Sequence, residues 1–193
     1  MEEVYQTQVK VPKSRVAVVI GTKGVTKAEI EEATGVQLSV NTEEGIVSLR
    51  SDDPLKLYNV QQIVKAIARG FNPKKAMLLL KGDFMFEIID LKEFVKKDHM
   101  LRVKGRVIGE EGKCRENIER LTETMISVYG KTVSILGRTE NVTLAKRALT
   151  NLIQGSPHAN VYHWLEKKRV ELKVREILPK DFLREEYKDE RID

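Results

Sequence analysis

Residues 19–24 read VIGTKG, and residues 107–112 read VIGEEG. The two segments lie 88 positions apart, and the same offset pairs Lys27 with Arg115. A run of matches at one offset indicates an internal repeat. The sequence therefore predicts two copies of one domain, each with a Gly-x-x-Gly loop near its start.

Hydrophobic patterning predicts the same element order, β-α-α-β-β-α, around both loops. In the first copy we expect a strand over 6–11, helices over 15–20 and 26–34, strands over 36–40 and 46–50, and a helix over 55–69. In the second copy we expect a strand within 84–94, helices on both sides of 109–112, strands over 126–129 and 132–136, and a helix over 141–154. The fold class is α+β, with two three-stranded antiparallel sheets, each packed on three helices. We place the first domain at 1–75, the second at 82–155, and a C-terminal helical extension and tail at 156–193.

Helix ends are predicted from residues that favour them. Thr26, Ser51 and Thr139 are suited to cap helix N-termini, because their hydroxyls can accept hydrogen bonds from free backbone N–H groups. Pro73 cannot continue a helix, so the segment around it is expected to connect the two domains.

Each Gly-x-x-Gly loop is expected to open a helix. Two glycines three positions apart let the backbone turn tightly and let another chain approach closely. The free N–H groups at a helix start carry the positive end of the helix dipole and attract phosphate. Two such loops therefore predict two sites for a phosphate-bearing ligand.

Composition narrows the function classes. Lys plus Arg number 34 against 29 Asp plus Glu, which gives a net charge of +5 and permits nucleic-acid binding. Cys114 is the one cysteine, so the chain has no internal disulfide or thiolate cluster, and a reducing cytoplasm is expected. No apolar run is long enough to span a membrane, and the start lacks a secretory signal. Because hydrolase, metalloprotease and P-loop motifs are missing, we expect neither catalysis, nor a bound cofactor, nor a metal.

The repeated loop within this element order resembles the KH-domain family, in its type I form, over residues 5–155. In that family the GxxG loop holds about four nucleotides of single-stranded RNA against an apolar groove. The resemblance implies that the first domain binds RNA through Arg15, Gly21, Thr22, Lys23, Gly24, Lys27, Leu38 and Arg50. Two alternatives stay open: Leu38 could be a core residue, and Arg50 could pair with Asp52 or Asp53.

The second loop departs from the family's habit of placing a basic residue between the glycines. Its two carboxylates would repel phosphate, although they would also favour a helix N-terminus. Neighbouring basic residues could outweigh them. For the second domain the resemblance implies an RNA site made of Arg102, Lys104, Arg106, Gly109, Glu110, Glu111, Gly112, Lys113, Arg115 and Arg138.

Residues 155–162 read GSPHANVY and open an expected helix over 160–174. With two type I KH units before it, this stretch makes the chain resemble archaeal members of the Dim-two family, also called Partner of Nob-one. The resemblance implies a monomeric factor that binds the 3′ end of 16S rRNA during maturation of the small ribosomal subunit. It also implies two protein partners, a Nob-one-type endonuclease and the alpha subunit of translation initiation factor two.

Three other functions stay possible at this point. A transcription factor with tandem KH units would also bind RNA, but its units are usually type II. An RNA-decay subunit normally adds an S1-type barrel, for which this chain has no room. A KH-derived protein-interaction scaffold is favoured by one feature, the acidic pair Glu110 and Glu111.

Overall fold

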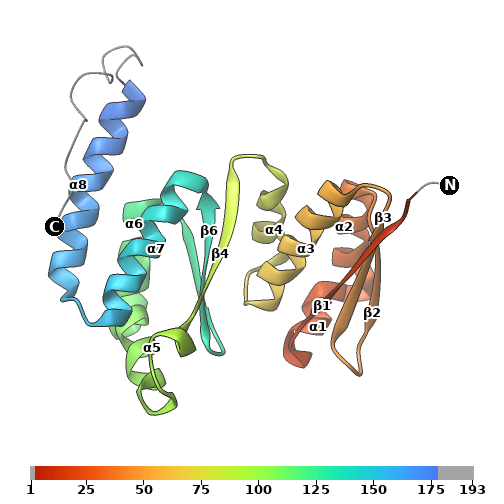
Figure 1. The fold of residues 1–193 in the computed structure, drawn as a ribbon, viewed down its shortest axis with the longest axis horizontal. Coiled ribbons are helices and arrows are strands. Elements are labelled where there is room, and N and C mark those ends of the chain that lie inside the picture. The colour runs from red at the N-terminus through yellow and green to blue at the C-terminus, as the bar shows by residue number, and fades with distance from the viewer. Residues whose placement is uncertain (1–2, 178–193) are drawn as a thin grey trace.

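The computed structural model describes residues 3–177, and side chains through residue 174. The rest of the predicted tail lies outside the described residues. Two α+β domains stand next to each other, and a long helix lies against the second (Figure 1). The predicted fold class, two type I KH units plus a C-terminal helix, is confirmed.

Both domains contain the predicted elements in the predicted order. The first domain comprises β1 (Tyr5–Lys10), α1 (Lys13–Ile20), α2 (Val25–Thr34), β2 (Gln37–Asn41), β3 (Ile46–Ser51) and α3 (Pro54–Ala68). The second comprises β4 (Phe84–Asp90), α5 (Met100–Ile108), α6 (Lys113–Thr122), β5 (Met125–Tyr129), β6 (Thr132–Arg138) and α7 (Thr139–Gln154). Helix α8 (His158–Ile177) follows. Both sheets are antiparallel, with strand orders β1-β3-β2 and β4-β6-β5.

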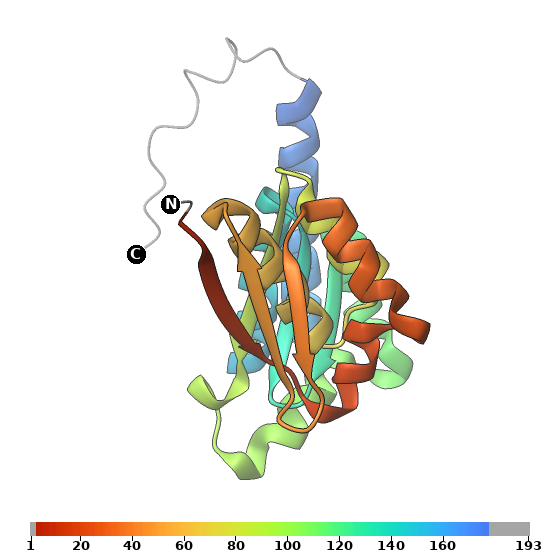
Figure 2. The same ribbon diagram turned by 90° about the vertical axis from the view of Figure 1, so that its right-hand side faces the viewer.

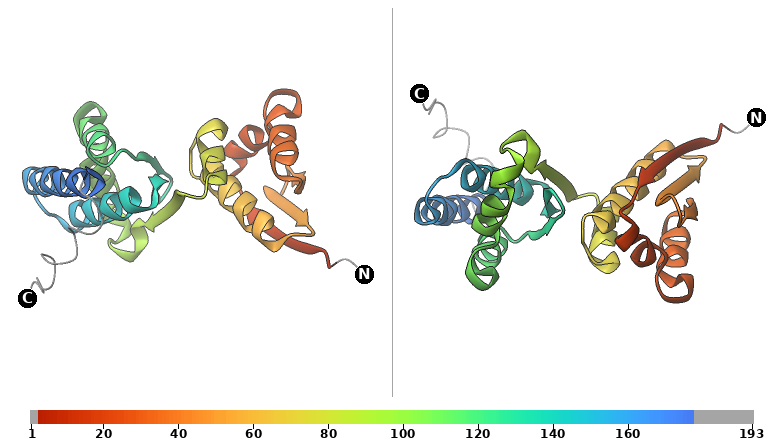
Figure 3. Two further views of the ribbon diagram at one scale, coloured as in Figure 1. Left: turned by 90° about the horizontal axis from the view of Figure 1, so that it is seen from above. Right: turned by 90° about the horizontal axis from the view of Figure 1, so that it is seen from below.

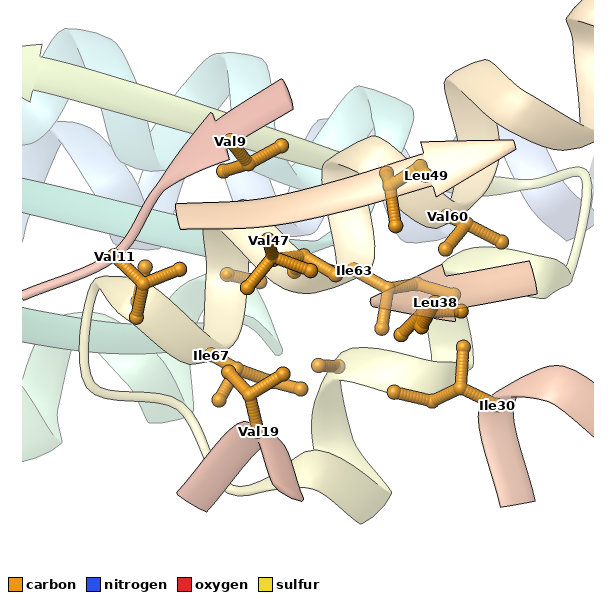
Figure 4. Close-up of a cluster of buried hydrophobic side chains, with 14 of the residues drawn as sticks. Val9, Val11, Val19, Ile30, Leu38, Val47, Leu49, Val60, Ile63 and Ile67 are labelled. Carbon is orange, nitrogen blue, oxygen red and sulfur yellow. The ribbon is translucent and has the colours of Figure 1, made fainter. Parts of the chain in front are cut away.

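Alternation along the strands explains the core of the first domain. Val47 and Leu49 on β3 and Leu38 on β2 point to one face of the sheet and are at most 3% exposed. They meet the apolar stripe of α3, which includes Val60, Ile63 and Ile67 (Figure 4). Burial of these side chains is the main force that joins the helices to the sheet.

All three predicted helix caps are wrong. Asp53, rather than Ser51, caps α3, because its carboxylate accepts hydrogen bonds from the backbone N–H groups of residues 55 and 56. Gly24 precedes α2, so Thr26 lies inside the helix. Thr139 is the first residue of α7, and its backbone N–H and hydroxyl both donate to the Asp83 carbonyl.

The connector is also more than a linker. It forms helix α4 (Pro73–Ala76) and the 3-10 helix η2 (Met77–Leu80). Ala76 and Leu79 are buried in the core of the first domain. The predicted boundary at residue 75 therefore falls inside a packed helix.

The first domain packs its α3 end and connector on the outer face of the second domain's sheet. Leu136 on β6 is fully buried and belongs to the first domain's core, together with partly buried Phe84, Phe86 and Met125. The Phe71 and Phe86 rings meet edge to face, with centroids 6.0 Å apart. As a result, β6 is buried on both faces, from Val133 to Gly137.

Polar contacts fix the alignment of this interface. The hydroxyls of Ser14 and Tyr129 lie 2.6 Å apart. The Ser127 hydroxyl donates to the Arg69 carbonyl at 2.7 Å. Gly70 lies so close that a Cβ atom there would come within 2.5 Å of the Ser127 hydroxyl oxygen. The two domains therefore meet through a specific, closely fitted surface.

The repeat explains why only one sheet is covered. Gln37 pairs with Arg50 in the first sheet, and Met125 pairs with Leu136 in the second, so Gln37 and Arg50 take the places of Met125 and Leu136. The outer face of the first sheet therefore carries polar groups where the second carries apolar ones. An apolar sheet face left in water would be unfavourable, so the second sheet is the one that gains a partner.

Replacing Leu136 by Ala tests this interface. We expect L136A to lower the free energy of unfolding by about 2–5 kcal/mol, because it empties a buried site shared by both domains. The control is L101A, whose side chain is 82% exposed and should matter by less than about 0.5 kcal/mol. Urea unfolding measures both, and an equal effect of the two substitutions would contradict the described interface.

Candidate nucleic-acid interface

The two Gly-x-x-Gly loops have the same backbone conformation. Gly21 and Gly24 have φ values of 76° and 81°, and Gly109 and Gly112 have 74° and 81°. The third residue of each loop, Lys23 or Glu111, also has positive φ, at 53° and 52°. Replacing Thr-Lys by Glu-Glu between the glycines therefore leaves the loop geometry unchanged.

The first glycine of each loop is required by a close approach. A Cβ atom on Gly21 would lie 2.6 Å from the backbone nitrogen of Thr26, and one on Gly109 would lie 2.8 Å from that of Cys114. The second glycine faces open space: a Cβ atom on Gly24 would meet nothing within 4 Å. The tight first position presses the loop against the start of α2 or α6, and the open second position leaves room for a ligand.

One hydrogen-bond arrangement occurs in both domains. The Glu31 carboxylate accepts the backbone N–H of Leu38 at 2.7 Å, and the Glu119 carboxylate accepts that of Ile126 at 2.6 Å. These bonds attach α2 to the edge strand β2, and α6 to the edge strand β5. The same carboxylates pair with two predicted RNA ligands, Lys27 at 3.8 Å and Arg115 at 3.7 Å. The offset of 88 relates each residue of this arrangement in the first domain to its counterpart in the second. The repeat in the sequence therefore carried a signal for the hydrogen bond and the ion pair.

Arg15 and Arg106 have structural contacts that the sequence did not reveal. Arg15 donates to the carbonyls of Ile67 and Phe71, at 2.9 and 2.7 Å. Arg106 donates to the carbonyls of Leu152 and Ser156, at 3.2 and 2.7 Å. The Arg15 guanidinium thus joins α1 to the end of α3, and the Arg106 guanidinium joins α5 to the end of α7. These contacts point to a scaffold role for both arginines.

The GSPH stretch, residues 155–158, contacts Arg106 as well. The Ser156 carbonyl accepts from Arg106, and the His158 ring nitrogen Nε2 lies 2.9 Å from the Arg106 carbonyl oxygen. The stretch therefore holds the start of α8 against α5. From there α8 packs along α6 and α7, where Trp164 stacks with Arg147 at 5.0 Å.

Three further predicted ligands differ in exposure. Leu38 is 3% exposed and belongs to the core, which favours the core alternative over an RNA contact. Arg50 is exposed on β3, and no ion pair with Asp52 or Asp53 forms within the described residues. Arg138 is exposed beside Asp83, with 3.4 Å between Nε and the carboxylate.

The two Gly-x-x-Gly loops, residues 21–24 and 109–112, are called the first and second clamp, and they differ in charge. Thr22 and Lys23 are exposed on the first loop. Glu110 and Glu111 are exposed on the second, and Glu111 pairs with Lys113 at 2.9 Å. Arg102 and Lys104 lie on α5, which leads into the second loop.

Cys114 begins α6 directly after the second clamp and is 4% exposed. Burial raises the pKa of its thiol, so the residue is a buried apolar group rather than an activated thiolate. Burial, with the neighbouring Cys114, also raises the pKa of Tyr162 to about 12. Both residues therefore stay neutral where α8 meets the second domain.

Both clamps lie on the same side of the molecule. Figures 2 and 3 place the α1–α2 and α5–α6 helix pairs on one side, and strands β1 and β4 toward the other. Within residues 3–177, no helix is long and apolar enough to cross a membrane, and no cluster of His, Cys, Asp and Glu could hold a metal. The geometry favours a ligand that reaches both loops on one side.

Comparisons with known proteins agree with this geometry. Residues 6–68 match the family described as KH domain, and residues 85–170 match the eukaryotic-type KH domain, type I, of the second PNO1 unit. The KH domain-containing protein MJ0443 of Methanocaldococcus jannaschii is 43% identical over 85% of this chain and 74% of its own length. Dim2p from Pyrococcus horikoshii is 42% identical, with a TM-score of 0.79 over 84% of this chain and 99% of that one.

The chain belongs to the archaeal Dim2/PNO1 family. Another solved structure, the a/eIF2alpha–aDim2p–rRNA complex from Pyrococcus horikoshii, is 41% identical, with a TM-score of 0.82 over 87% of this chain and 96% of that one. The pre-rRNA-processing protein pno1 of Aspergillus fumigatus is 34% identical over 72% of this chain. This Dim2/PNO1 chain spans 59% of that protein's length.

The two glycines of the first loop should respond differently to alanine. G24A should cost about 1–2 kcal/mol of unfolding free energy, because an L-residue is strained at positive φ. G21A should cost more, because its methyl group also meets the backbone of α2. Thermal and urea unfolding of both variants provide the measurement. An equal or smaller loss for G21A would show that the loop does not press on the helix as described.

Proposed function

We propose that this protein is an RNA-binding factor of small-subunit ribosome biogenesis that holds the single-stranded 3′ end of 16S rRNA through both clamps. The observation that carries the proposal is the pair of GxxG loops with one backbone conformation on one side of the molecule. The free N–H groups of the helix after each loop are suited to a phosphate. The second glycine of the first loop faces open space, and that of the second loop has only the ends of the Glu116 and Arg115 side chains nearby. The relatives support the role, since they include pre-rRNA-processing proteins and an rRNA complex.

The fixed contact between the domains adds to the binding. When the first clamp has bound a strand, the second meets the same strand at a high effective concentration, which can raise affinity by about 10²–10⁴. Two sites of about four nucleotides each also lengthen the sequence that is recognised. The proposed ligand is therefore one continuous strand rather than two separate ones.

The proposal includes partners and a location. The rRNA complex of the Pyrococcus relative contains the alpha subunit of translation initiation factor two, which we propose as a partner here. A Nob-one-type endonuclease would supply the cleavage, and this chain would act without a catalytic step of its own, as a monomer in the cytoplasm.

A titration of the full chain with RNA tests the proposal. We expect tight, salt-dependent binding to single-stranded RNA that matches the 3′ end of archaeal 16S rRNA, and weaker binding to a scrambled RNA of equal length. T22D/K23D should reduce the affinity at least about tenfold, because it places carboxylates on the first clamp. The control K56D/N59D makes the same change in charge on α3, away from the loop. Equal affinity for both RNAs, or no effect of T22D/K23D, would contradict the proposal.

The acidic loop provides a second prediction. E110Q/E111Q removes two negative charges beside the proposed phosphate and should raise RNA affinity several-fold, most strongly at low salt. The same titration measures it. A loss of RNA affinity would mean that the carboxylates themselves contact the RNA. No change in RNA affinity, with loss of a protein partner, would favour the scaffold function for the second clamp.

A further inference from the structure

A crevice of about 440 Å³ lies at the junction of the two domains. Its walls come from β1 and α3 of the first domain and β4 of the second. Strands β1 and β4 are each at the edge of their sheet. Figure 3 places these strands on the side away from the two clamp helix pairs. This junction crevice is therefore separate from both GxxG loops.

Cations from two different elements converge on the junction crevice. Lys10 comes from β1, whereas Lys65 and Arg69 come from the last turn of α3 and the residue after it. The helix C-terminus accounts for basic residues on α3, because the helix dipole is negative there. It does not account for Lys10, which arrives on a strand.

The crevice has one carboxylate, and that carboxylate is already paired. Glu87 accepts a hydrogen bond from Lys146 on α7 at 3.1 Å. Lys10, Lys65 and Arg69 have no ion pair within residues 3–174. The crevice thus has an excess of positive charge on surrounding walls that are partly apolar, where charges interact more strongly than in open water.

Arg69 is the crevice cation that can bind an anion at more than one atom. Its side chain is partly buried and lines the crevice, and its Nε atom is closed to solvent. An anionic oxygen in the crevice would therefore bind the outer nitrogens of the guanidinium group. The guanidinium group is well suited to phosphate oxygens.

The other lining groups favour a nucleotide over an acidic peptide. Gln8 and Gln62 present amide groups that can both donate to and accept from base or sugar edges. Phe86 also lines the crevice, where its ring packs edge to face on Phe71 and closes the apolar floor. Cations and amides together form the donor set of a site for single-stranded nucleic acid.

We propose that the junction crevice binds the phosphate backbone of a second RNA segment, adjacent in sequence to the segment held by the two clamps. This inference rests on the proposed function, because it assumes that the clamps hold one part of the same RNA. The chain would then hold RNA on two opposite sides, with the domain junction between them.

The test compares two RNAs and two variants of the full chain. The short RNA has about ten nucleotides, enough for both clamps. The longer RNA carries the same segment with its upstream rRNA sequence added. K10Q/K65Q removes two crevice charges, and the control K74Q/K75Q removes two charges from exposed lysines on α4.

We expect K10Q/K65Q to weaken binding of the longer RNA about tenfold and to leave binding of the short RNA unchanged. The slope of log affinity against log salt for the longer RNA should fall by about 1.4, as expected when two single-strand phosphate contacts are lost. K74Q/K75Q should affect both RNAs equally and only slightly. Matching thermal unfolding curves confirm that each variant is folded.

Other outcomes overturn the inference in distinguishable ways. If the short RNA binds but K10Q/K65Q leaves the longer RNA unaffected, the crevice does not bind RNA, and the clamp function stands. If the variant instead loses binding to an oligoglutamate peptide while RNA binding is unchanged, the crevice belongs to an acidic protein partner. If the wild-type chain binds neither RNA, the proposed function itself fails.

Discussion

The structure depends on the burial of one sheet face by a neighbouring domain. The outer face of the second sheet carries Phe86, Met125 and Leu136, and the end of α3 with its connector covers them. Apolar burial supplies the attraction, and the hydrogen bonds of Ser127 and Ser14 select one alignment. The relative position of the two GxxG loops follows from this contact, because each loop is fixed within its own domain. A carboxylate ties the helix after the loop to the edge strand, and an arginine ties the helix before the loop to the end of α3 or α7.

The two clamps have the same backbone geometry but different side-chain chemistry. Glycine conformation and the close contact with the next helix define the backbone, and these are the same in both domains. The two residues between the glycines point to solvent, so they can change without cost to the fold. In such a repeat, the backbone of both loops can stay the same while the charge of the side chains in each loop evolves separately. The Thr-Lys and Glu-Glu pairs represent such a divergence.

The sequence was sufficient for the repeat, the element order and the loops, because these depend on local patterns. It was insufficient where a side chain acts across elements. Arg15 and Arg106 have the same role but do not lie 88 positions apart, so the repeat could not relate them. Asp53 takes the cap that Ser51 was expected to form, because either residue fits the local pattern and only the backbone decides. The docking face was not predicted either, because the offset of 88 fails across the hairpin: the strand registers place Arg50, two residues beyond Ser48, where Leu136 stands.

The asymmetric stacking of the domains has a consequence for assembly. A domain whose helical side fits the sheet side of its neighbour can in principle add further copies without limit, as solenoid arrays do. Here growth is stopped at both ends. The first sheet presents Gln37, Ser39 and Arg50 instead of an apolar face, and α8 covers the helical side of the second domain. Helix α8 is in this sense a cap on the second unit, and the described residues form a closed pair of units.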